Sequence, residues 1–325
     1  TELHAIPGGV GRNPVLLDIA PESPLLAGVY LSRDRLSVIL TDLKLTVLHR
    51  NSTALAAETA ESLRDKLLAL TGQILSLAPR RVLGFGVSAI GLLDIERGVL
   101  LNPHNFYGIQ NFPIVRLLEE WYELPVFLHN DMKAAALAEK LFGKMKKEQN
   151  FIYLGLSNGI GAGIMVDGRL FGSDATGEIG HLSLDEQGLP CTCGRKGCLE
   201  TYASLPIVLD RLKEACGLPN LSPEEFPQVL EDWRAVPVME DVMEKLASAL
   251  IDMVNLMDTD AIIIGHEGCF IPQRYFSLLE DEVNLHMFAA GYKKISVMPS
   301  FFGTEAPLFG SVCCVLDALF SGCPL

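Results

Sequence analysis

The feature that most constrains the fold is a pattern of short β-type runs that occurs twice along the chain. The six runs, in two sets of three, are 26–31, 36–41 and 44–49, then 151–157, 162–168 and 169–172. Runs that are β-branched or alternately apolar and polar, separated by tight turns, predict consecutive strands. The repetition predicts two related α/β lobes with a cleft between them.

Helix-like and strand-like segments alternate after each set of runs. Apolar residues at helical spacing predict helices over 55–77, 113–123, 132–142, about 200–213, 239–257, 272–286 and 307–320. Further strands are predicted at 81–87, 125–131, 261–265 and 293–300. The 325 residues are enough for two domains. We expect a connector over 1–25, an N-terminal lobe over 26–130 and a C-terminal lobe over 131–325, whose final helix can pack back on the first lobe.

Charge and composition limit the partners of this chain. The net charge of −14 would repel a phosphate backbone, so these residues are not expected to contact DNA themselves. No apolar run is long enough to suggest a membrane span. The opening residues TELHAIPGG lack the basic and apolar regions of a secretory signal. The eight cysteines therefore predict a reducing, cytoplasmic setting rather than a disulfide framework.

Three cysteines and one histidine crowd into GEIGHLSLDEQGLPCTCGRKGCLE, which spans residues 177–200. The pattern H-x9-C-x-C-x4-C is formed by His181, Cys191, Cys193 and Cys198. The glycines at 194 and 197 allow the chain to turn tightly enough for the three sulfurs to converge. Three thiolates and one imidazole make a closed tetrahedral set for a structural Zn²⁺. A thioredoxin-like redox site would need C-x-x-C, which is absent; three thiols without a metal are the remaining alternative.

The segment 177–200, continued by TYAS at 201–204, resembles the signature of the ROK family, which comprises sugar kinases, sugar-responsive repressors and uncharacterised relatives. Motifs elsewhere extend the resemblance over 26–320. The resemblance implies an α/β fold of the two-lobed, actin-like (ribonuclease H-like) type, with a zinc-braced loop.

Members of this family hold a monosaccharide, and the resemblance implies which residues would contact one here. They are Asn105, Asn130, Asp131, Glu178, His181 and Glu200. Carboxylates and amides suit a sugar because its hydroxyls both donate and accept hydrogen bonds. His181 could give one ring nitrogen to zinc and the other to a hydroxyl. Near Asn105 the match is weaker, because Ile109 replaces the family's tryptophan.

Each of these residues also has a simpler structural interpretation. Asn105 suits a turn, and Asn130 with Asp131 suits a cap on the helix that follows. Glu178 and Glu200, taken alone, would be solvated carboxylates. Their joint occurrence in the order that the family has favours sugar binding, because motifs gain force from context.

The resemblance to the kinases is weakest where a nucleotide would bind. The family's first phosphate loop, D-x-G-G-T, aligns with YLSRD. The carboxylate and both glycines of that loop are thus replaced, by Tyr30, Ser32, Arg33 and Asp34. Asp34 would place a negative charge toward the phosphates, and the Arg33 side chain takes up the space of a glycine.

Two further nucleotide elements can be compared. The second loop, G-T-G-x-G-x-G, aligns with SNGIGAG and so contains Asn158, Gly159, Gly161 and Gly163. The family's Gly-Gly-Gly turn for adenosine aligns with Gly265, His266 and Glu267. Two of the three elements are therefore damaged. Because backbone amides approach phosphates only at glycine-rich turns, no ATP binding is expected.

Residues 8–43 resemble the junction that follows the winged helix-turn-helix in ROK regulators. We therefore interpret the chain as the sugar-sensing and dimerising region of a ROK-type transcriptional regulator, similar to the N-acetylglucosamine- and glucose-responsive repressors. The winged helix is expected upstream of Thr1. Expected partners are a monosaccharide or sugar phosphate, operator DNA bound through that winged helix, a second copy in a dimer or dimer of dimers, and a sugar-transport protein.

Two other functional classes stay open at this point. The first is an active, ATP-dependent hexose or N-acetylhexosamine kinase, in which Asp131 would be the general base. The second is a protein-binding module that takes no ligand.

Overall fold

The computed structural model describes residues 2–3, 16–103, 106–173 and 175–323, and the chain divides into two compact units. Unit 1 comprises residues 1–128 and 314–325, and unit 2 comprises residues 129–313. Both units are α/β, and each contains a five-stranded mixed sheet.

The sheet of unit 1 has the strand order β5-β4-β3-β6-β9. Its strands are β3 (Leu25–Leu31), β4 (Arg35–Thr41), β5 (Val47–Ala54), β6 (Val82–Ala89) and β9 (Val126–Asn130), of which the last reaches into unit 2. β3, β4 and β5 are antiparallel, and β3 and β6 are parallel. Small strand pairs are formed by β1 (Glu2–Leu3) with β2 (Leu16–Leu17), and by β7 (Leu93–Asp94) with β8 (Val99–Leu100).

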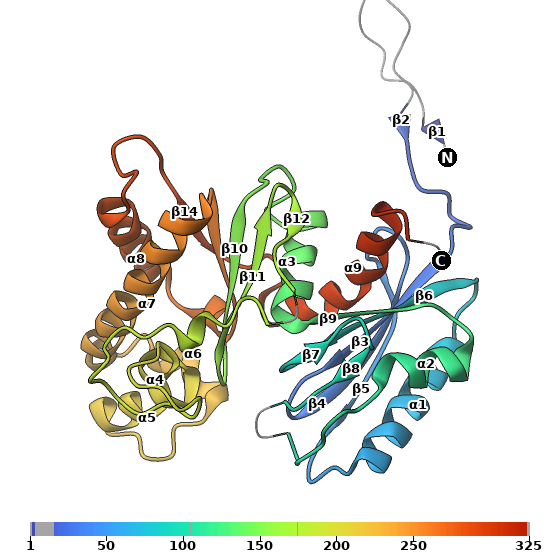
Figure 1. The fold of residues 1–325 in the computed structure, drawn as a ribbon, viewed down its shortest axis with the longest axis horizontal. Helices are drawn as coiled ribbons and strands as arrows, with labels where there is room; N and C mark the ends of the chain where they lie inside the picture. Colours follow the sequence, from blue (N-terminus) through green and yellow to red (C-terminus); the bar gives the residue numbers. More distant parts are fainter. Residues whose placement is uncertain (1, 4–15, 104–105, 174, 324–325) are drawn as a thin grey trace, which may run out of the picture. The chain divides into compact units, whose positions relative to one another are not determined.

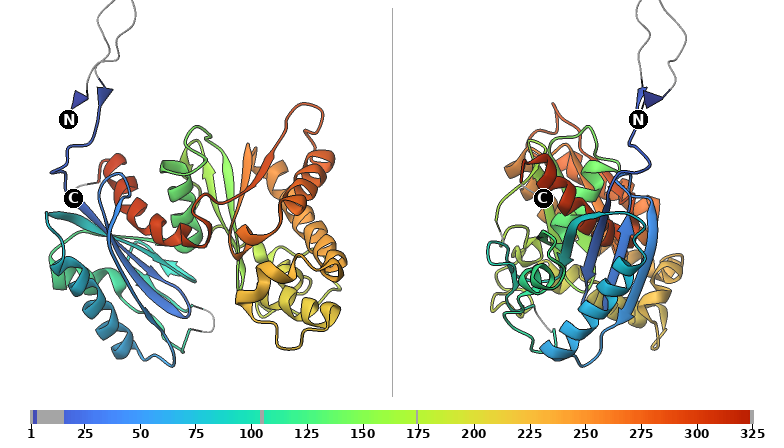
Figure 2. Two further views of the ribbon diagram at one scale, coloured as in Figure 1. Left: turned by 180° about the vertical axis from the view of Figure 1, so that it is seen from behind. Right: turned by 90° about the vertical axis from the view of Figure 1, so that its right-hand side faces the viewer.

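Two helices cover this sheet, α1 (Ala60–Ser76) and α2 (Ile114–Tyr122) (Figure 1). α1 begins at a capping box, in which the side chains of Thr59 and Ser62 each accept a hydrogen bond from the other residue's backbone N–H. Leu63, Leu67 and Leu70 recur at helical spacing and are buried. Figure 2 shows α1 alongside the strands that it contacts, β4 and β5.

The sheet of unit 2 has the order β12-β11-β10-β13-β14, which repeats the pattern of unit 1. Its strands are β10 (Phe151–Leu156), β11 (Ile160–Val166), β12 (Arg169–Leu170), β13 (Ala261–His266) and β14 (Ser296–Pro299). β10, β11 and β12 are antiparallel, whereas β10, β13 and β14 are parallel. The predicted repetition of three consecutive strands is thus confirmed.

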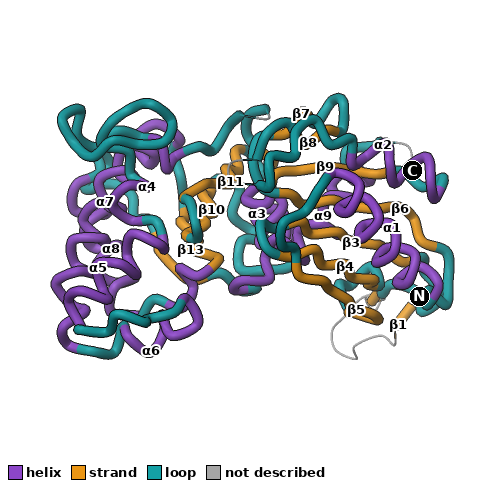
Figure 3. The backbone as a smooth tube through the Cα atoms, turned by 90° about the horizontal axis from the view of Figure 1, so that it is seen from below, coloured by secondary structure: helices purple, strands orange, loops and turns teal. Residues whose placement is uncertain are grey.

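Helices cover both faces of the unit 2 sheet. α3 (Asp131–Leu141) lies on one face, and α7 (Val236–Met257) and α8 (Gln273–His286) lie on the other (Figure 1). α5 (Leu205–Cys216) groups with α7 and α8 in Figure 3. The remaining helical segments are α4 (Glu200–Ala203), α6 (Phe226–Val229), α9 (Ala306–Phe320) and the 3₁₀ turns η1 (Ile179–His181), η2 (Pro223–Glu225), η3 (Trp233–Ala235), η4 (Glu267–Phe270) and η5 (Gly303–Glu305).

Helix α3 packs against β11 with no side chain between the two backbones at Gly163. A Cβ at Gly163 would clash with the carbonyl oxygen of Met132 and lie 2.8 Å from the Cβ of Ala136. On α9, a Cβ at Gly310 would clash with the backbone of Ala134. α3 is therefore held closely at its first turns, which carry Asn130 and Asp131.

Two elements differ from the sequence-based expectation. The strand expected at 44–49 lies at Val47–Ala54, because residues 42–46 form a turn in which Asp42 accepts backbone hydrogen bonds from Lys44 and Thr46. β5 is an edge strand whose polar side chains face solvent, so its sequence lacks apolar alternation. The helix expected over about 200–213 is divided at Ser204 into α4 and α5.

The segment Gly303–Phe320, which comprises η5 and α9, is long and apolar enough to cross a membrane by length and composition. Sixty-one per cent of it is buried within the fold, and core helices pass the same test.

Candidate functional site

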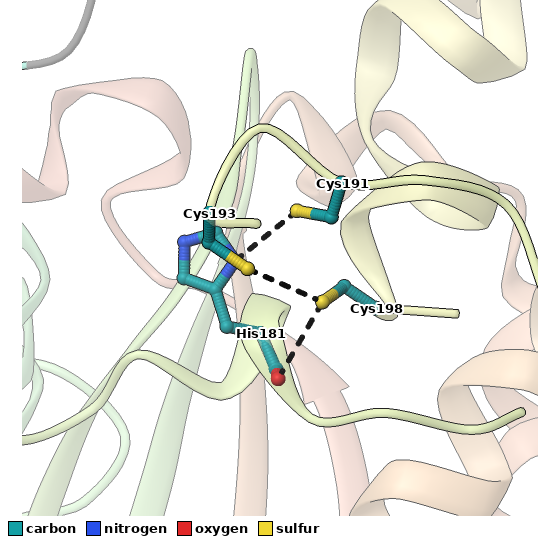
Figure 4. A group of neighbouring side chains, drawn as sticks. All are labelled: His181, Cys191, Cys193 and Cys198. Atoms are coloured by element: carbon teal, nitrogen blue, oxygen red, sulfur yellow. Dashed lines mark hydrogen bonds between the residues drawn. The ribbon is translucent and has the colours of Figure 1, made fainter. Parts of the chain in front are cut away.

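A cysteine and histidine cluster forms at the junction of η1 and the loop that follows it (Figure 4). Its four possible ligand atoms, from His181, Cys191, Cys193 and Cys198, all lie within 4.8 Å of one another. The Sγ atoms of Cys193 and Cys198 are 3.6 Å apart, and Cys191 Sγ lies 3.6 Å from His181 Nδ1. The residues singled out from the sequence as metal ligands are therefore brought together.

Tight turns in the loop make this convergence possible. Gly194 and Gly197 have φ values of +89° and +66°, and a Cβ at Gly197 would clash with the backbone of Asp185. Cys191 N–H donates to Arg195 O, which closes the turn between the first two cysteines and the third. Both glycines thus lie at positions whose positive φ favours glycine.

The separations fit a single metal ion. Ligand atoms of a tetrahedral site with metal–sulfur bonds of about 2.3 Å lie roughly 3.8 Å apart. Three thiolates and an imidazole, with no carboxylate among the four, are the donor set of structural zinc sites. The cluster can thus bind a metal, and the loop from 182 to 199 would be fastened to η1 by it.

Glu200, the first residue of α4, lies beside the cluster. Its Oε1 is 3.2 Å from Cys191 Sγ and 3.5 Å from His181 Nδ1. The Nδ1 atom of His181 therefore faces the sulfurs, and Nε2 lies on the opposite edge of the ring (Figure 4). This arrangement leaves one imidazole nitrogen for the cluster and one for another group.

Three carboxyl groups of unit 2 act on one another electrostatically. Asp131, at the start of α3, is buried, and its burial together with the charge of Glu178 raises its pKa to about 7. Glu178, just before η1, is more exposed, but the surrounding protein and the charge of Glu200 still raise its pKa. His181 and Lys133 act in the opposite direction on Glu178.

Asn130 caps helix α3. Its Oδ1 accepts a hydrogen bond of 2.9 Å from Met132 N–H, and Asp131 Oδ1 accepts one of 3.0 Å from the same group. The capping interpretation of these two residues is thus confirmed. It does not compete with ligand binding, because the cap fixes the direction of both side chains at the helix N-terminus.

Five of the six residues expected to contact a sugar belong to unit 2: Asn130, Asp131, Glu178, His181 and Glu200. The sixth, Asn105, lies outside the described residues. Glu178 interacts electrostatically with Asp131, His181 and Glu200. Glu200 in turn contacts Cys191 of the cluster directly.

The segment that aligns with the first phosphate loop is a β-hairpin turn between β3 and β4. Ser32 N–H donates to Arg35 O, and Ser32 Oγ donates to a carboxylate oxygen of Asp34 at 2.9 Å. Tyr30 is part of β3, opposite Ser37 and Ser88. Among the described residues, the buried Nε of Arg33 has no hydrogen-bond partner.

The glycines that align with the second phosphate loop have a packing role that sequence reasoning missed. Met132 of α3 lies against Gly161, where a Cβ would be 3.0 Å from the Met132 side chain. A Cβ at Gly163 would clash with the backbone of α3, as described above. Gly159 is close to Glu200, with 3.7 Å between the site of a Cβ and Glu200 Oε2. Asn158 lies between β10 and β11.

Sequence reasoning also missed Lys133. This residue is only 2% exposed, and its Nζ donates a hydrogen bond to Ser173 O. The available signal was a lysine in a segment of α3, MKAAALAE, that is otherwise apolar until Glu139. A charged residue on a buried helix face needs a partner.

Comparison with known proteins gives a consistent result. The chain matches the ROK family over residues 26–318. It is 28% identical to the xylose repressor of Caldicellulosiruptor bescii, with 96% of this chain and 83% of that protein covered.

Two solved structures of the family resemble the fold. One is a ROK family transcriptional regulator described as a homologue of the Escherichia coli Mlc protein, with a TM-score of 0.84, 26% identity, and coverage of 92% of this chain and 79% of that chain. The other is the ROK hexokinase of Thermus thermophilus, with a TM-score of 0.79, 27% identity, and coverage of 92% and 100%. Since the family match extends over most of its length, the chain belongs to the ROK family.

Proposed function

We propose that this chain is the sugar-sensing and dimerising region of a ROK transcriptional regulator, which represses sugar-utilisation genes in the cytoplasm. The observation that carries the proposal is the group of carboxylates and His181 beside the Cys₃His cluster of unit 2. The similarity to a xylose repressor and to a ROK regulator supports the regulatory class.

The effector is a monosaccharide or sugar phosphate. It is bound by side chains of unit 2, namely those of Asn130, Asp131, Glu178, His181 and Glu200. Carboxylates and an imidazole are suitable because each sugar hydroxyl can donate to one group and accept from another. His181 connects the effector to the metal, since Nδ1 faces the cysteines and Nε2 is directed away from them. The metal is zinc, and its role is to hold the loop that carries the ligands.

ATP binding is not part of this function. A hairpin turn with its own Ser32–Asp34 hydrogen bond occupies the position of the first phosphate loop. The residues aligned with the turn for adenosine, Gly265, His266 and Glu267, also lack two of the family's three glycines.

Other partners follow from the family assignment. Operator DNA would be bound by a winged helix outside this chain, because the net charge of −14 opposes DNA binding by these residues. A homodimer or a dimer of dimers would place two such winged helices on the two half-sites of an operator. A sugar-transport protein is a further proposed partner.

Isothermal titration with a panel of hexoses, pentoses, amino sugars and their phosphates tests the proposal. At least one is expected to bind, and Glu178→Gln is expected to weaken that binding by roughly tenfold, because a hydrogen bond to a charged group is lost. Glu186→Gln is the matched control, since Glu186 is an exposed glutamate of the loop that follows η1. If no sugar binds the wild-type protein, the sensor function is wrong.

An ATP-dependent hexose or N-acetylhexosamine kinase is the second candidate. Asp131 favours it, since a carboxyl with a pKa of about 7 can accept a proton from a sugar hydroxyl near neutral pH. A coupled assay with ATP, Mg²⁺ and glucose, mannose or N-acetylglucosamine separates the candidates. Turnover that disappears in Asp131→Asn would establish the kinase, and no turnover is expected.

A further inference from the structure

The turn before Glu178 is fastened to helix α3 by a buried lysine. Lys133 lies on α3, is 2% exposed, and donates from Nζ to Ser173 O. The same carbonyl oxygen accepts a hydrogen bond of 3.1 Å from Thr176 N–H. Both bonds converge on the turn that ends at Gly177, the residue directly before Glu178.

Strand β11 also holds the turn, at Gly177. Gly177 O accepts a hydrogen bond of 2.7 Å from Ala162 N–H of β11. Gly177 has a φ of +101°, and a Cβ there would clash with Ala162 O. The backbone before Glu178 is therefore held by β11 at one point and by Lys133 of α3 at another.

We propose that Lys133 is a positioning residue of the effector site: its buried ammonium group fixes the backbone at Ser173 and Thr176 and thereby presets the carboxylate of Glu178 for the ligand. This inference rests on the proposed function, in which Glu178 binds the effector. The charge of Lys133 also acts on Glu178 directly, as a favourable interaction with the ionised carboxylate. Helix α3 thus contributes to the proposed site through Asn130, Asp131 and Lys133, which all lie at its N-terminal end.

Because Lys133 is charged and buried, substitutions at this position are expected to affect the turn that it contacts. A buried ammonium group needs acceptors, and the carbonyl of Ser173 is one of them. Methionine has a similar length and would fill the same space without a donor. Arginine would keep both the charge and a donor. The two substitutions therefore separate packing from hydrogen bonding.

The experiment compares Lys133→Met, Lys133→Arg and Lys140→Met in the intact chain. Lys140 is the matched control because it lies on the same helix. Its Nζ also donates a hydrogen bond, of 2.6 Å, to a backbone carbonyl, that of Glu148. The first readout is the affinity for the sugar that binds wild type most tightly in the titration panel. The second is the amide hydrogen exchange of Thr176, with the amide of Phe171, which is bonded to Ile164 O, as internal reference.

In Lys133→Met we expect affinity to fall by about tenfold or more and the Thr176 amide to exchange faster, with Phe171 unchanged. Lys133→Arg should recover most of the affinity, and Lys140→Met should match wild type in both readouts. Equal affinity in Lys133→Met and wild type would overturn the proposal, as would equal loss in the Met and Arg variants.

Failure of the proposed function gives a different result. If wild type binds no sugar, the sensor function and the ligand part of this inference both fail. The exchange data still test whether Lys133 fixes the turn. If the Thr176 amide exchanges at the same rate in Lys133→Met and in wild type, Lys133 does not fix it.

Discussion

At the residue scale, the carboxyl of Asp131 is buried and has a strongly raised pKa. Its burial, rather than a single partner, is the main cause of its raised pKa, and the nearby charge of Glu178 adds to it. Hydrogen bonds from Met132 N–H act in the opposite direction. A carboxyl in this state is protonated in about half of the molecules near neutral pH, so it can either donate to or accept from a sugar hydroxyl.

The raised pKa of Asp131 makes the free energy of unfolding depend on pH. Between the ordinary value of 3.8 and about 7, the folded state keeps a proton that the unfolded state releases. The free energy of unfolding therefore falls as pH rises through this window and is lowest above pH 7. At about 1.4 kcal/mol per pKa unit, the total decrease due to Asp131 is up to about 4 kcal/mol. Asp131→Asn removes this loss.

Denaturant unfolding of Asp131→Asn and wild type at pH 4 to 8 measures the effect. We expect the variant to be more stable at pH 8 and the difference to shrink toward pH 4. Asp252→Asn, at an exposed position of α7, is the control. A difference that is constant with pH would contradict the proposed protonation of Asp131.

At the element scale, helix α3 organises the site of unit 2. Its cap residue Asn130 and its first residue Asp131 are two of the proposed effector ligands. Its buried Lys133 donates a hydrogen bond to Ser173 O, and its backbone packs on β11. The loop from 182 to 199 is the second such element. It has little regular structure, and its shape depends on the turns at Gly194 and Gly197 and on the metal that its cysteines can bind.

Gly163→Ala tests the packing of α3 on β11. The added methyl group would clash with Met132 O and approach Ala136, so α3 must shift. We expect a loss of about 1–3 kcal/mol in the free energy of unfolding, as for other overpacked sites. Gly291→Ala is the control, because no atom lies within 4 Å of its added Cβ. Equal stability of the two variants would mean that Gly163 is not needed for packing.

Cys198→Ser tests the metal centre. Cys198 is fully buried and its sulfur lies 3.6 Å from that of Cys193, so its loss removes one of four ligands. The protein purified with zinc should carry close to one equivalent, measured by elemental mass spectrometry, and the variant should carry far less and have a lower Tm. The exposed Cys323 provides the control Cys323→Ser. Stoichiometric zinc in Cys198→Ser would exclude the Cys₃His site.

At the scale of the whole molecule, one topology is used twice. Both sheets place three antiparallel strands beside two further strands in the same order, and both units are covered by helices. Unit 2 carries the Cys₃His cluster and five of the six proposed effector residues, while unit 1 carries the hairpin turn at 32–35 that aligns with the first phosphate loop of the kinases. The charge of −14 belongs to the molecule as a whole.

That charge predicts the behaviour of the chain toward DNA. In physiological salt these 325 residues alone should show no binding to duplex DNA up to about 100 µM, because their net charge of −14 repels the phosphate backbone. Fluorescence anisotropy with a labelled duplex of random sequence measures this. Tight binding by the 325 residues would contradict a sensor region separate from the DNA-binding part.

The sequence by itself determined the features that depend on local pattern. Strand triplets, helical periodicity and the spacing of His181 and the three cysteines are each encoded within short segments, so they can be read without knowing which distant segments meet. The position predicted for β5 was wrong, because an exposed edge strand does not need apolar alternation.

Only the tertiary structure showed which residues that are far apart in the sequence contact each other. It showed that Lys133 meets Ser173, that Glu200 lies beside Cys191, and that Gly161 and Gly163 accommodate helix α3 rather than only a phosphate. These roles depend on the approach of elements that are far apart in sequence, and on the burial that results. No periodicity or spacing along the chain records either of them.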